Sequence, residues 1–358
     1  MKTLMAAFFL VGLVSLGLQA QSAPLPLPLK TVEGYQIQLI SNQVRGARFI
    51  AVAPNGDIVV ALISEGRVVA VDQNSAPDSP PRMVIGGLPR PNAVVFRGND
   101  LYIADNTGVV RIKDYPRGIP ETLINDLPVH GGHMNRALAL DAQGNIFVSS
   151  GSDCNICVEH DPRLASILRY NADGTRGRIF ASGLRNASGL AFDSRGRLWA
   201  VVNQRDNLAP DHTDLPPDEL DLIQEGGNYG WPTAYPDGNK RLANPEFPGA
   251  SVADFLPTTL NIQAHSAPLE IALDSKTETL FIAYQGSWNR VPPTGYKVVR
   301  VDLGAEWTGK PKAPEDFVTG WLTPRGRVLA HPIGVALGPD SSLYISDDSG
   351  NIFKVTKS

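Results

Sequence analysis

The stretch FIAVAPNGDIVVA, residues 49–61, reads as an apolar strand, a tight polar turn and a second apolar strand. The same pattern, with a short turn rich in Gly, Asp or Asn, recurs five times: AVVFRGNDLYIA (93–104), ALALDAQGNIFVS (137–149), GLAFDSRGRLWAV (189–201), EIALDSKTETLFIA (270–283) and GVALGPDSSLYIS (334–346). Apolar strands joined by such turns predict β-hairpins. The chain therefore contains six copies of one supersecondary unit.

The spacing of these hairpins indicates how they are arranged. Their second strands begin at Ile58, Leu101, Ile146, Leu198, Leu280 and Leu343. A hairpin with a further pair of strands needs about 40–45 residues, the length of one propeller blade. The repeat therefore predicts an all-β, six-bladed β-propeller over residues 31–358, with insertions after the fourth and fifth hairpins. Two unrelated β-domains would not explain a repeat shared across residues 49–346.

Composition agrees with a large, turn-rich globular protein. The 358 residues include 34 glycines and 29 prolines, and 42% of them are hydrophobic, which is too rich for a disordered chain. A net charge of −4 without a basic stripe argues against a nucleic-acid partner. Two cysteines are too few for a fold built on disulfides.

The first residues have the pattern of a targeting segment. A basic start is followed by an apolar run from Leu4 to Leu18 and a small residue, Ala20, which predicts a signal peptide over residues 1–20. The apolar run is short for the alternative, a membrane anchor. Residues 21–30 are expected to form a Pro-rich linker, and no later apolar run has membrane length. We therefore expect export to the periplasm or the medium, with no membrane span in the mature chain.

Polar residues gather where each blade begins. In a propeller, the loops that lead into the inner strands open on one face around the axis; we call them the axial loops. They are expected to bring together the basic and amide side chains of Arg48, Arg90, His133, Arg136, Arg185, Asn186, His265 and His331. Any one of these residues could instead tie down a blade edge. As a set they would repel one another, which predicts an anionic ligand with carboxylate or phosphate groups.

Longer motifs carry a resemblance to a known family. GGHMNRAL (131–138), GSDCNIC (151–157), LRNASGLAF (184–192), EGGNYGWP (225–232), GSWNR (286–290) and LYISDDSGNI (343–352) occur in this order. Together they resemble the sugar dehydrogenases that depend on pyrroloquinoline quinone (PQQ), the glucose/sorbosone dehydrogenase family, on its L-sorbosone dehydrogenase-like branch. The resemblance covers nearly all of the mature chain, and it implies a six-bladed propeller.

The resemblance also implies roles for individual residues. His133 matches the general base that takes a proton from a sugar hydroxyl while hydride passes to PQQ. Arg185 and Asn186 match the pair that faces the quinone oxygens, where negative charge grows. Arg290 matches a cationic contact to PQQ, and the axial residues Arg48, Arg136 and His331 are further candidates.

Calcium is the second cofactor that the resemblance implies. The backbone carbonyls of Gln204 and Arg205 match donors to a Ca²⁺ ion that also binds PQQ. Glu219 and Tyr229 match a structural Ca²⁺ site, with Asp237 as third donor; a solvated acidic loop is the alternative for these three.

Two positions depart from the family pattern, and a pair of cysteines needs its own explanation. Gln285 stands where sorbosone-type relatives carry histidine, and His331 stands where an arginine is expected to clamp a PQQ carboxylate. Cys154 and Cys157 form a C-x₂-C in a chain expected to be exported, and no second pair completes a zinc site. We expect a local disulfide that pins the loop near His133.

Three classes of function remain open on the sequence. The first is an exported PQQ- and Ca²⁺-dependent oxidoreductase that acts on a sugar or a sugar-derived aldehyde or polyol and passes electrons to an unidentified acceptor. The second is a propeller without catalysis that binds a saccharide or a protein, which the change to His331 favours. The third is a Ca²⁺-dependent lactonase, although the axial loops offer it only the carboxylate of Glu270.

Overall fold

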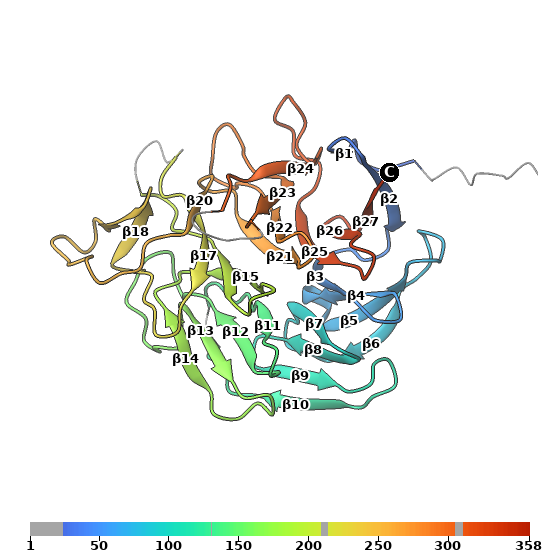
Figure 1. The fold of residues 1–358 in the computed structure, drawn as a ribbon, viewed down its shortest axis with the longest axis horizontal. Coiled ribbons are helices and arrows are strands. Elements are labelled where there is room, and N and C mark those ends of the chain that lie inside the picture. Colours follow the sequence, from blue (N-terminus) through green and yellow to red (C-terminus); the bar gives the residue numbers. More distant parts are fainter. Residues whose placement is uncertain (1–23, 130, 209–213, 305–310) are drawn as a thin grey trace, which may run out of the picture.

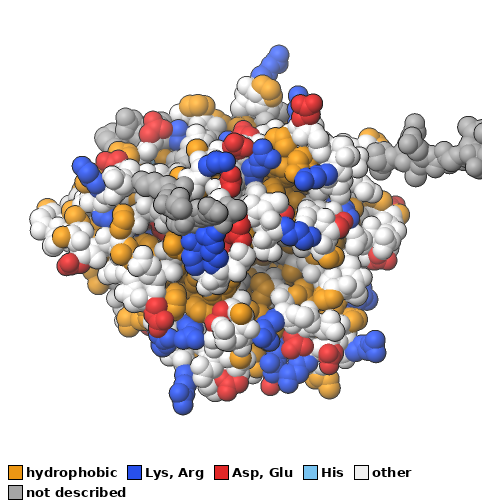
Figure 2. Space-filling model, in the orientation of Figure 1, with side chains coloured by type: hydrophobic (Ala, Val, Ile, Leu, Met, Phe, Trp, Pro, Cys, Tyr) orange, Lys and Arg blue, Asp and Glu red, His pale blue; other side chains and the backbone are white. Residues whose placement is uncertain are grey.

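Nearly all of the regular secondary structure in the computed structural model, which describes residues 24–129, 131–208, 214–304 and 311–358, is β-strand. The sheets stand as six blades around a central axis (Figure 1), and each blade contains one of the predicted hairpins. The predicted six-bladed β-propeller is thus confirmed. On the face drawn in Figure 2, Lys and Arg side chains are interspersed with Asp and Glu.

Each blade runs from the axis outward in chain order. The inner strands are β3 (Ala47–Val52), β7 (Ala93–Arg97), β11 (Leu138–Leu140), β15 (Ala187–Phe192), β21 (Pro268–Asp274) and β25 (Pro332–Leu337). The second strands are β4 (Asp57–Leu62), β8 (Asp100–Ala104), β12 (Ile146–Ser150), β16 (Leu198–Val202), β22 (Thr279–Tyr284) and β26 (Leu343–Asp347). The third strands are β5 (Arg67–Asp72), β9 (Val109–Ile112), β13 (Ser166–Tyr170), β17 (Asp218–Ile223), β23 (Lys297–Asp302) and β27 (Ile352–Lys357). A short 3₁₀ turn, η1 (Ile63–Glu65), joins β4 to β5.

The outermost strands close the ring. Five blades use β6 (Arg82–Gly86), β10 (Pro120–Ile124), β14 (Arg178–Ser182), β20 (Leu260–Ile262) and β24 (Glu315–Thr319). In the sixth blade the outer strand comes from the other end of the chain, because β2 (Tyr35–Ser41) pairs antiparallel with β27, with Ile37 opposite Val355. The first and last blades are thereby held together by backbone hydrogen bonds (Figure 1).

Part of the predicted linker belongs to the propeller. Strand β1 (Lys30–Thr31) adds to the edge of β24, and Leu29 is buried in the cluster that fills blades 5 and 6. Leu25 and Leu27 pack against the same cluster. The segment predicted as a linker thus packs against the propeller from Leu25 onward. The predicted signal peptide, residues 1–20, lies outside the described residues.

The core lies between the blades, which explains why the strands are apolar on both faces. In β4, Ile58 and Val60 pack toward blade 6, whereas Val59 and Ala61 pack toward blade 2. Successive side chains of a strand point to opposite faces, so both faces of a central strand must be apolar when blades cover both.

Blades 4 and 5 carry the predicted insertions. Between β17 and β20, blade 4 inserts a hairpin of β18 (Ala234–Asp237) and β19 (Lys240–Ala243), which reaches the margin of the ring (Figure 1). Blade 5 has a long connection between β22 and β23. In the described ranges, no helix has the length and apolar character needed to cross a bilayer.

Candidate functional site

A polar pocket of about 250 Å³ is formed where several axial loops meet. Its lining comes from four blades, 1, 3, 4 and 5, and consists mainly of basic, amide and acidic side chains: Arg48, His133, Asn135, Arg185, Asn186, Asn203, Gln204, Asp206, Asp218, His265, Gln285 and Trp288. Five of the residues predicted to converge from separate axial loops thus line one pocket: Arg48, His133, Arg185, Asn186 and His265.

His133 is held by the loop that follows β12. Its Nδ1 lies 2.9 Å from Ser152 Oγ and 3.0 Å from the Ser152 carbonyl oxygen. The Ser152 hydroxyl itself donates to the Cys154 carbonyl (2.7 Å), so its oxygen acts as an acceptor toward His133. Both neighbours of Nδ1 are acceptors, and the proton of a neutral imidazole must therefore sit on Nδ1. Nε2 is then the basic nitrogen.

A glycine allows this loop to approach so closely. A Cβ built on Gly151 would lie 2.4 Å from the His133 carbonyl oxygen and 3.0 Å from Asn186 Oδ1. Any side chain at position 151 would therefore push His133 and Asn186 apart. The glycine of the GSDCNIC motif brings residues from two blades to one wall of the pocket.

Arg185 is almost fully buried and firmly held. Its Nε donates to the Asn155 carbonyl (3.1 Å), Nη1 to the carbonyls of Asn203 (3.3 Å) and Gln204 (2.8 Å), and Nη2 to Asn155 Oδ1 (3.0 Å). Nη2 also lies 3.7 Å from Asp206 Oδ2. Burial lowers the pKa of Arg185 to about 10, with Asp206 acting in the opposite direction, so the guanidinium remains charged at neutral pH.

Arg48 provides the second arginine of the pocket. Its Nε donates to Asn92 Oδ1 (3.1 Å) and its Nη2 to Asn135 Oδ1 (3.0 Å), which joins β3 to the axial loops of blades 2 and 3. Burial lowers its pKa to about 10 as well, while Glu270 raises it. Arg48 is thus a second fixed cation on the pocket wall.

A third basic group comes from blade 5. His265 Nε2 lies 3.2 Å from the Leu215 carbonyl, and its Nδ1 lies 3.6 Å from Asp206 Oδ1. Burial opposes the charged form, but the contacts with Asp206 and Asp218 outweigh it and raise the pKa of His265. Burial acts to raise the pKa of Asp206. The contacts with His265 and Arg185 outweigh burial and hold this pKa below its usual value. His265 has a φ of 60°, a rare backbone conformation for a residue other than glycine.

Asp218 is the functional candidate that sequence reasoning missed. It is buried at the start of β17, where Oδ1 accepts from the Gln204 amide (2.9 Å) and Oδ2 from the Ala267 amide (3.1 Å). Burial raises its pKa to about 7 despite these donors. The available signal was DELDLI (218–223), a strand that carries three acidic residues where the neighbouring blades carry apolar ones.

Several predicted cofactor residues do not line the pocket. Arg136 is fully buried and donates to Ser150 Oγ and to two backbone carbonyls. Arg290 donates to the Ala264 carbonyl (2.9 Å) and to Asp214 (2.9 Å). His331 packs against Tyr296, and its Nδ1 lies 3.1 Å from the Gln285 carbonyl. Arg90 is exposed. Of the four arginines from which an anion-binding pocket was predicted, two line the pocket, Arg48 and Arg185.

Two of the predicted calcium donors, the Gln204 carbonyl and Glu219, have protein partners. The Gln204 carbonyl accepts from Arg185, and the Arg205 side chain pairs with Glu246. Glu219 is fully buried and contacts Gln204 Nε2 (2.5 Å) and the Arg241 guanidinium (2.7 Å).

The other two residues of the predicted structural calcium site lie apart from these contacts. Tyr229 donates its hydroxyl to the Leu222 carbonyl (2.8 Å), and Asp237 is exposed at the end of β18. The structure does not gather Glu219, Tyr229 and Asp237 as one set of calcium ligands, because Asp237 is at the surface and the buried pair already has protein partners.

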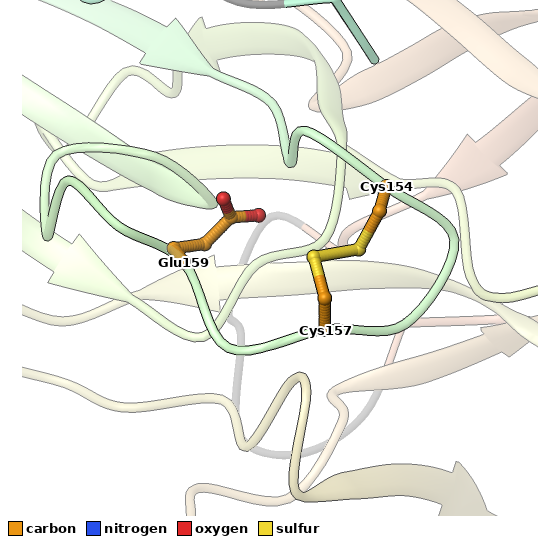
Figure 3. Close-up of side chains that lie close together, drawn as sticks. All are labelled: Cys154, Cys157 and Glu159. Atoms are coloured by element: carbon orange, nitrogen blue, oxygen red, sulfur yellow. A yellow bond between two sulfur atoms is a disulfide. The ribbon is translucent and has the colours of Figure 1, made fainter.

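The predicted disulfide between Cys154 and Cys157 is present (Figure 3). Glu159 lies beside it, and these three side chains are the one group of potential metal ligands close enough to share an ion among the described residues. Because both sulfurs are joined to each other, the group is a loop closure in this structure.

A second cavity, of about 350 Å³, lies along the axis between the inner strands. Glu270 reaches it from β21, and its Oε2 accepts from the amides of Ile50 (3.2 Å) and Val335 (2.8 Å). Burial raises the pKa of Glu270 well above its usual range. This carboxyl joins three inner strands and lines the axial cavity, not the polar pocket.

Comparison with known proteins agrees with this architecture. An uncharacterized protein of Borreliella burgdorferi is 25% identical over 382 residues, covering 98% of this chain and 96% of that protein. A pyrroloquinoline quinone-dependent pyranose dehydrogenase of Coprinopsis cinerea is 28% identical over 230 residues, which span 51% of this chain and 31% of that enzyme. The holo form of the PQQ domain of the C. cinerea pyranose dehydrogenase has the same fold, with a TM-score of 0.81, 21% identity and coverage of 94% of this chain and 99% of that one.

The propeller, the converging axial loops and these relatives define the class as the PQQ-dependent sugar dehydrogenases, as the motifs indicated. Within it, the chain belongs to the TrAA12-like family, whose model matches residues 29–246 and 250–358. The L-sorbosone branch stays a prediction.

Proposed function

We propose that the protein is an exported PQQ- and Ca²⁺-dependent dehydrogenase that oxidises a sugar or a sugar-derived aldehyde or polyol. One observation carries the proposal: a histidine whose tautomer leaves Nε2 basic shares a pocket with Arg185 and Asn186. A base and a fixed cation in one pocket suit the removal of a proton and a hydride from the same carbinol group. The sugar dehydrogenase relatives support the same reaction class.

The pocket has the chemistry that PQQ requires. PQQ carries three carboxylates and an ortho-quinone, and the wall offers Arg48, Arg185 and the imidazole of His265 to anionic groups. The buried Oδ1 of Asn186 has no partner among the described residues, and as an acceptor it suits a cation or a donor group of a ligand. These residues fit the cofactor. When bound, PQQ supplies a two-electron acceptor that takes hydride from the substrate carbon.

The protein's own residues then have separate tasks. His133 Nε2 takes the proton of the substrate hydroxyl, and Ser152 fixes the ring through Nδ1 so that no tautomer change is needed. Arg185 brings a positive charge that cannot rotate, because four of its N–H groups are committed to backbone and Asn155 oxygens. A charge held in place before the reaction costs no reorganisation when negative charge develops.

The pocket offers calcium further candidate ligands besides the predicted ones. Ca²⁺ prefers carboxylate and amide oxygens. The pocket wall includes the carboxylates of Asp206 and Asp218, and the amide oxygens Asn186 Oδ1 and Gln204 Oε1 are buried without a partner in the described part of the chain. These four residues, in place of the carbonyl of Arg205, would hold the ion, which would act as a Lewis acid and a template for the cofactor.

The remaining assignments follow from the same reaction. The partners are a small-molecule sugar and an electron acceptor, and the site of action is the periplasm or the medium. A lactonase is not favoured, because its candidate axial carboxylate, Glu270, accepts from two backbone amides in the axial cavity.

Titration with PQQ tests the proposal. The mature protein is mixed with PQQ in Ca²⁺ or in EDTA, and binding is followed by quenching of tryptophan fluorescence and by thermal shift. Saturable, Ca²⁺-dependent binding and turnover of aldoses, aldehydes or polyols with a dye acceptor are expected. Arg48→Gln should weaken PQQ binding at least about tenfold through loss of one charge-assisted pair, whereas Arg90→Gln, the exposed counterpart on blade 2, should not change it. Absence of saturable binding in the wild type would refute the proposal.

A further inference from the structure

The loop between β12 and β13 is cross-linked within itself. The Cys154–Cys157 disulfide closes a short ring around Asn155 and Ile156, and Glu159 folds back beside it (Figure 3). Glu159 Oε1 accepts a hydrogen bond from the Asp153 amide (2.9 Å). Asp153 in turn accepts from the amides of Gly131 (2.9 Å) and Gly132 (3.0 Å), which immediately precede His133. This segment, residues 151–159, is hereafter the disulfide loop.

Asn155, inside the ring, makes five hydrogen bonds across the site. Its carbonyl accepts from Arg185 Nε (3.1 Å) and from the indole of Trp231 (3.2 Å). Its Oδ1 accepts from Arg185 Nη2 (3.0 Å) and from the Asp206 amide (2.9 Å), and its Nδ2 donates to the Asp206 carbonyl (2.9 Å). One side chain thus joins the axial loop of blade 4 to the segment that carries Gln204 and Asp206.

We propose that Asn155, held by the disulfide loop, is the positioning residue that fixes the guanidinium of Arg185 and the backbone of Asp206 for the reaction. The proposal rests on the function proposed above for the part that Arg185 plays. Asn155 itself lines neither the axial cavity nor the polar pocket, so it acts through its pocket-lining partners Arg185 and Asp206.

The geometry explains why a dedicated positioning residue is needed. An arginine side chain has several rotatable bonds, and burial gives no direction to its charge. Arg185 donates hydrogen bonds from four N–H groups, and Asn155 accepts two of them, one with its backbone carbonyl and one with its side chain. Without Oδ1, Nη2 keeps only Asp206, 3.7 Å away, as an anionic neighbour and is expected to turn toward it, out of its present direction.

The disulfide supplies the rigidity of Asn155. A three-residue separation between the two cysteines limits the conformations open to Asn155. The same ring contains the Cys154 carbonyl that accepts from Ser152 Oγ, and Ser152 orients His133. The loop therefore supports the base on blade 3 and the cation on blade 4 at once.

Two substitutions test the proposal against a control in the same loop. Asn155→Ala removes Oδ1 and Nδ2, Asn155→Asp keeps an acceptor for Arg185 Nη2 and the Asp206 amide, and Val158→Ala changes a side chain that is 76% exposed. In the holoenzyme, Asn155→Ala is expected to lower kcat about 10- to 100-fold with little change in sugar KM, because a misplaced charge acts mainly in the transition state. Asn155→Asp should recover most of the loss, and Val158→Ala should match the wild type.

A readout without cofactor separates this proposal from the proposed function. In the apoprotein, hydrogen exchange of peptides covering 184–186 and 203–206 is expected to accelerate in Asn155→Ala and to return toward wild type in Asn155→Asp. If the wild type does not bind PQQ but these peptides respond, positioning stands and the assigned reaction falls. Unchanged exchange together with unchanged kcat in Asn155→Ala would overturn the positioning role.

The disulfide provides a third variant if Asn155→Ala does not fold. The double substitution Cys154→Ser/Cys157→Ser leaves Asn155 intact and is expected to give a smaller effect of the same kind: a several-fold loss of kcat and faster exchange of 203–206. Treatment of the wild type with dithiothreitol should reproduce it, and reoxidation should restore kcat. If the double variant and the dithiothreitol-treated protein both keep the hydrogen exchange rates and the kcat of the untreated wild type, the loop is not a positioning element.

Discussion

Blades 3 and 4 carry an arginine at the same place, two residues before the inner strand, and use it differently. Arg136 and Arg185 are both buried, burial lowers the pKa of each to about 10, and both donate to backbone carbonyls. Arg185 also lines the pocket and lies near Asp206, whereas Arg136 is fully enclosed. One arginine therefore serves the site and the other ties the blade together.

The third strands of blades 3 and 4 differ too, and again the polar residues are in blade 4. In blade 3, β13 reads SILRY and is mostly apolar, but in blade 4, β17 reads DELDLI and buries Asp218, Glu219 and Asp221. Buried carboxylates cost stability unless they are paired or protonated. The repeat thus sets a common backbone, and the site lies where one blade departs from its neighbours toward polar residues. This difference can be tested by changing matched residues in the two blades.

The largest effect is expected from the one residue that blade 3 gives to the chemistry. His133→Gln keeps a polar side chain but removes the base, and kcat for sugar oxidation should fall about 10²- to 10⁴-fold. PQQ affinity, measured by fluorescence titration, should change little. His160→Gln, an exposed histidine in the neighbouring loop, is the control. Turnover of His133→Gln within about threefold of wild type would remove the assignment of the base.

The two equivalent arginines should respond in opposite ways to the same substitution. Lysine keeps the charge but cannot form the guanidinium fork. Arg185→Lys should lower kcat about 10²-fold. Arg136→Lys should leave kcat nearly unchanged but lower the free energy of unfolding by about 2 kcal/mol, since buried carbonyls lose their donors. Steady-state kinetics and urea unfolding give both values. If Arg136→Lys lowers kcat without lowering the free energy of unfolding, Arg136 takes part in the reaction.

Sequence alone predicted what is repeated. The six hairpins, the blade count and the convergence of the axial loops follow from local alternation of apolar residues, which each segment carries by itself. The pairing of β2 with β27 did not follow, because its two partners lie at opposite ends of the chain and a seven-residue strand gives no signal of its partner.

Sequence alone predicted pocket residues only where the position of a residue relative to an inner strand decides where its side chain lies. Arg48, Arg185 and Asn186 reach the pocket because they lie at or just before the start of an inner strand, and His133 lies in the axial loop that leads into β11. Arg136 has the same sequence position as Arg185, and only the carbonyls around it decide that it points elsewhere. The role of Asn155 was missed because it depends on contacts with residues 30 and 51 positions away, which no pattern in the chain indicates.

The last effect, on stability and its pH dependence, concerns the acidic strand of blade 4. Burial, then Glu219, raise the pKa of Asp221 to about 8, so the folded protein holds this proton more tightly than the unfolded chain does. Its contribution to stability is therefore present at low pH and is lost as pH rises from about 4 to 8, by at most about 1.4 kcal/mol per pH unit.

Urea unfolding at several pH values should show that Asp221→Asn loses less stability than wild type over this range. The exposed Asp78→Asn should run parallel to wild type. If the difference between Asp221→Asn and wild type is independent of pH, Asp221 is charged in the fold, and the polar strand of blade 4 is stabilised by ion pairing with Arg241 in place of protonation.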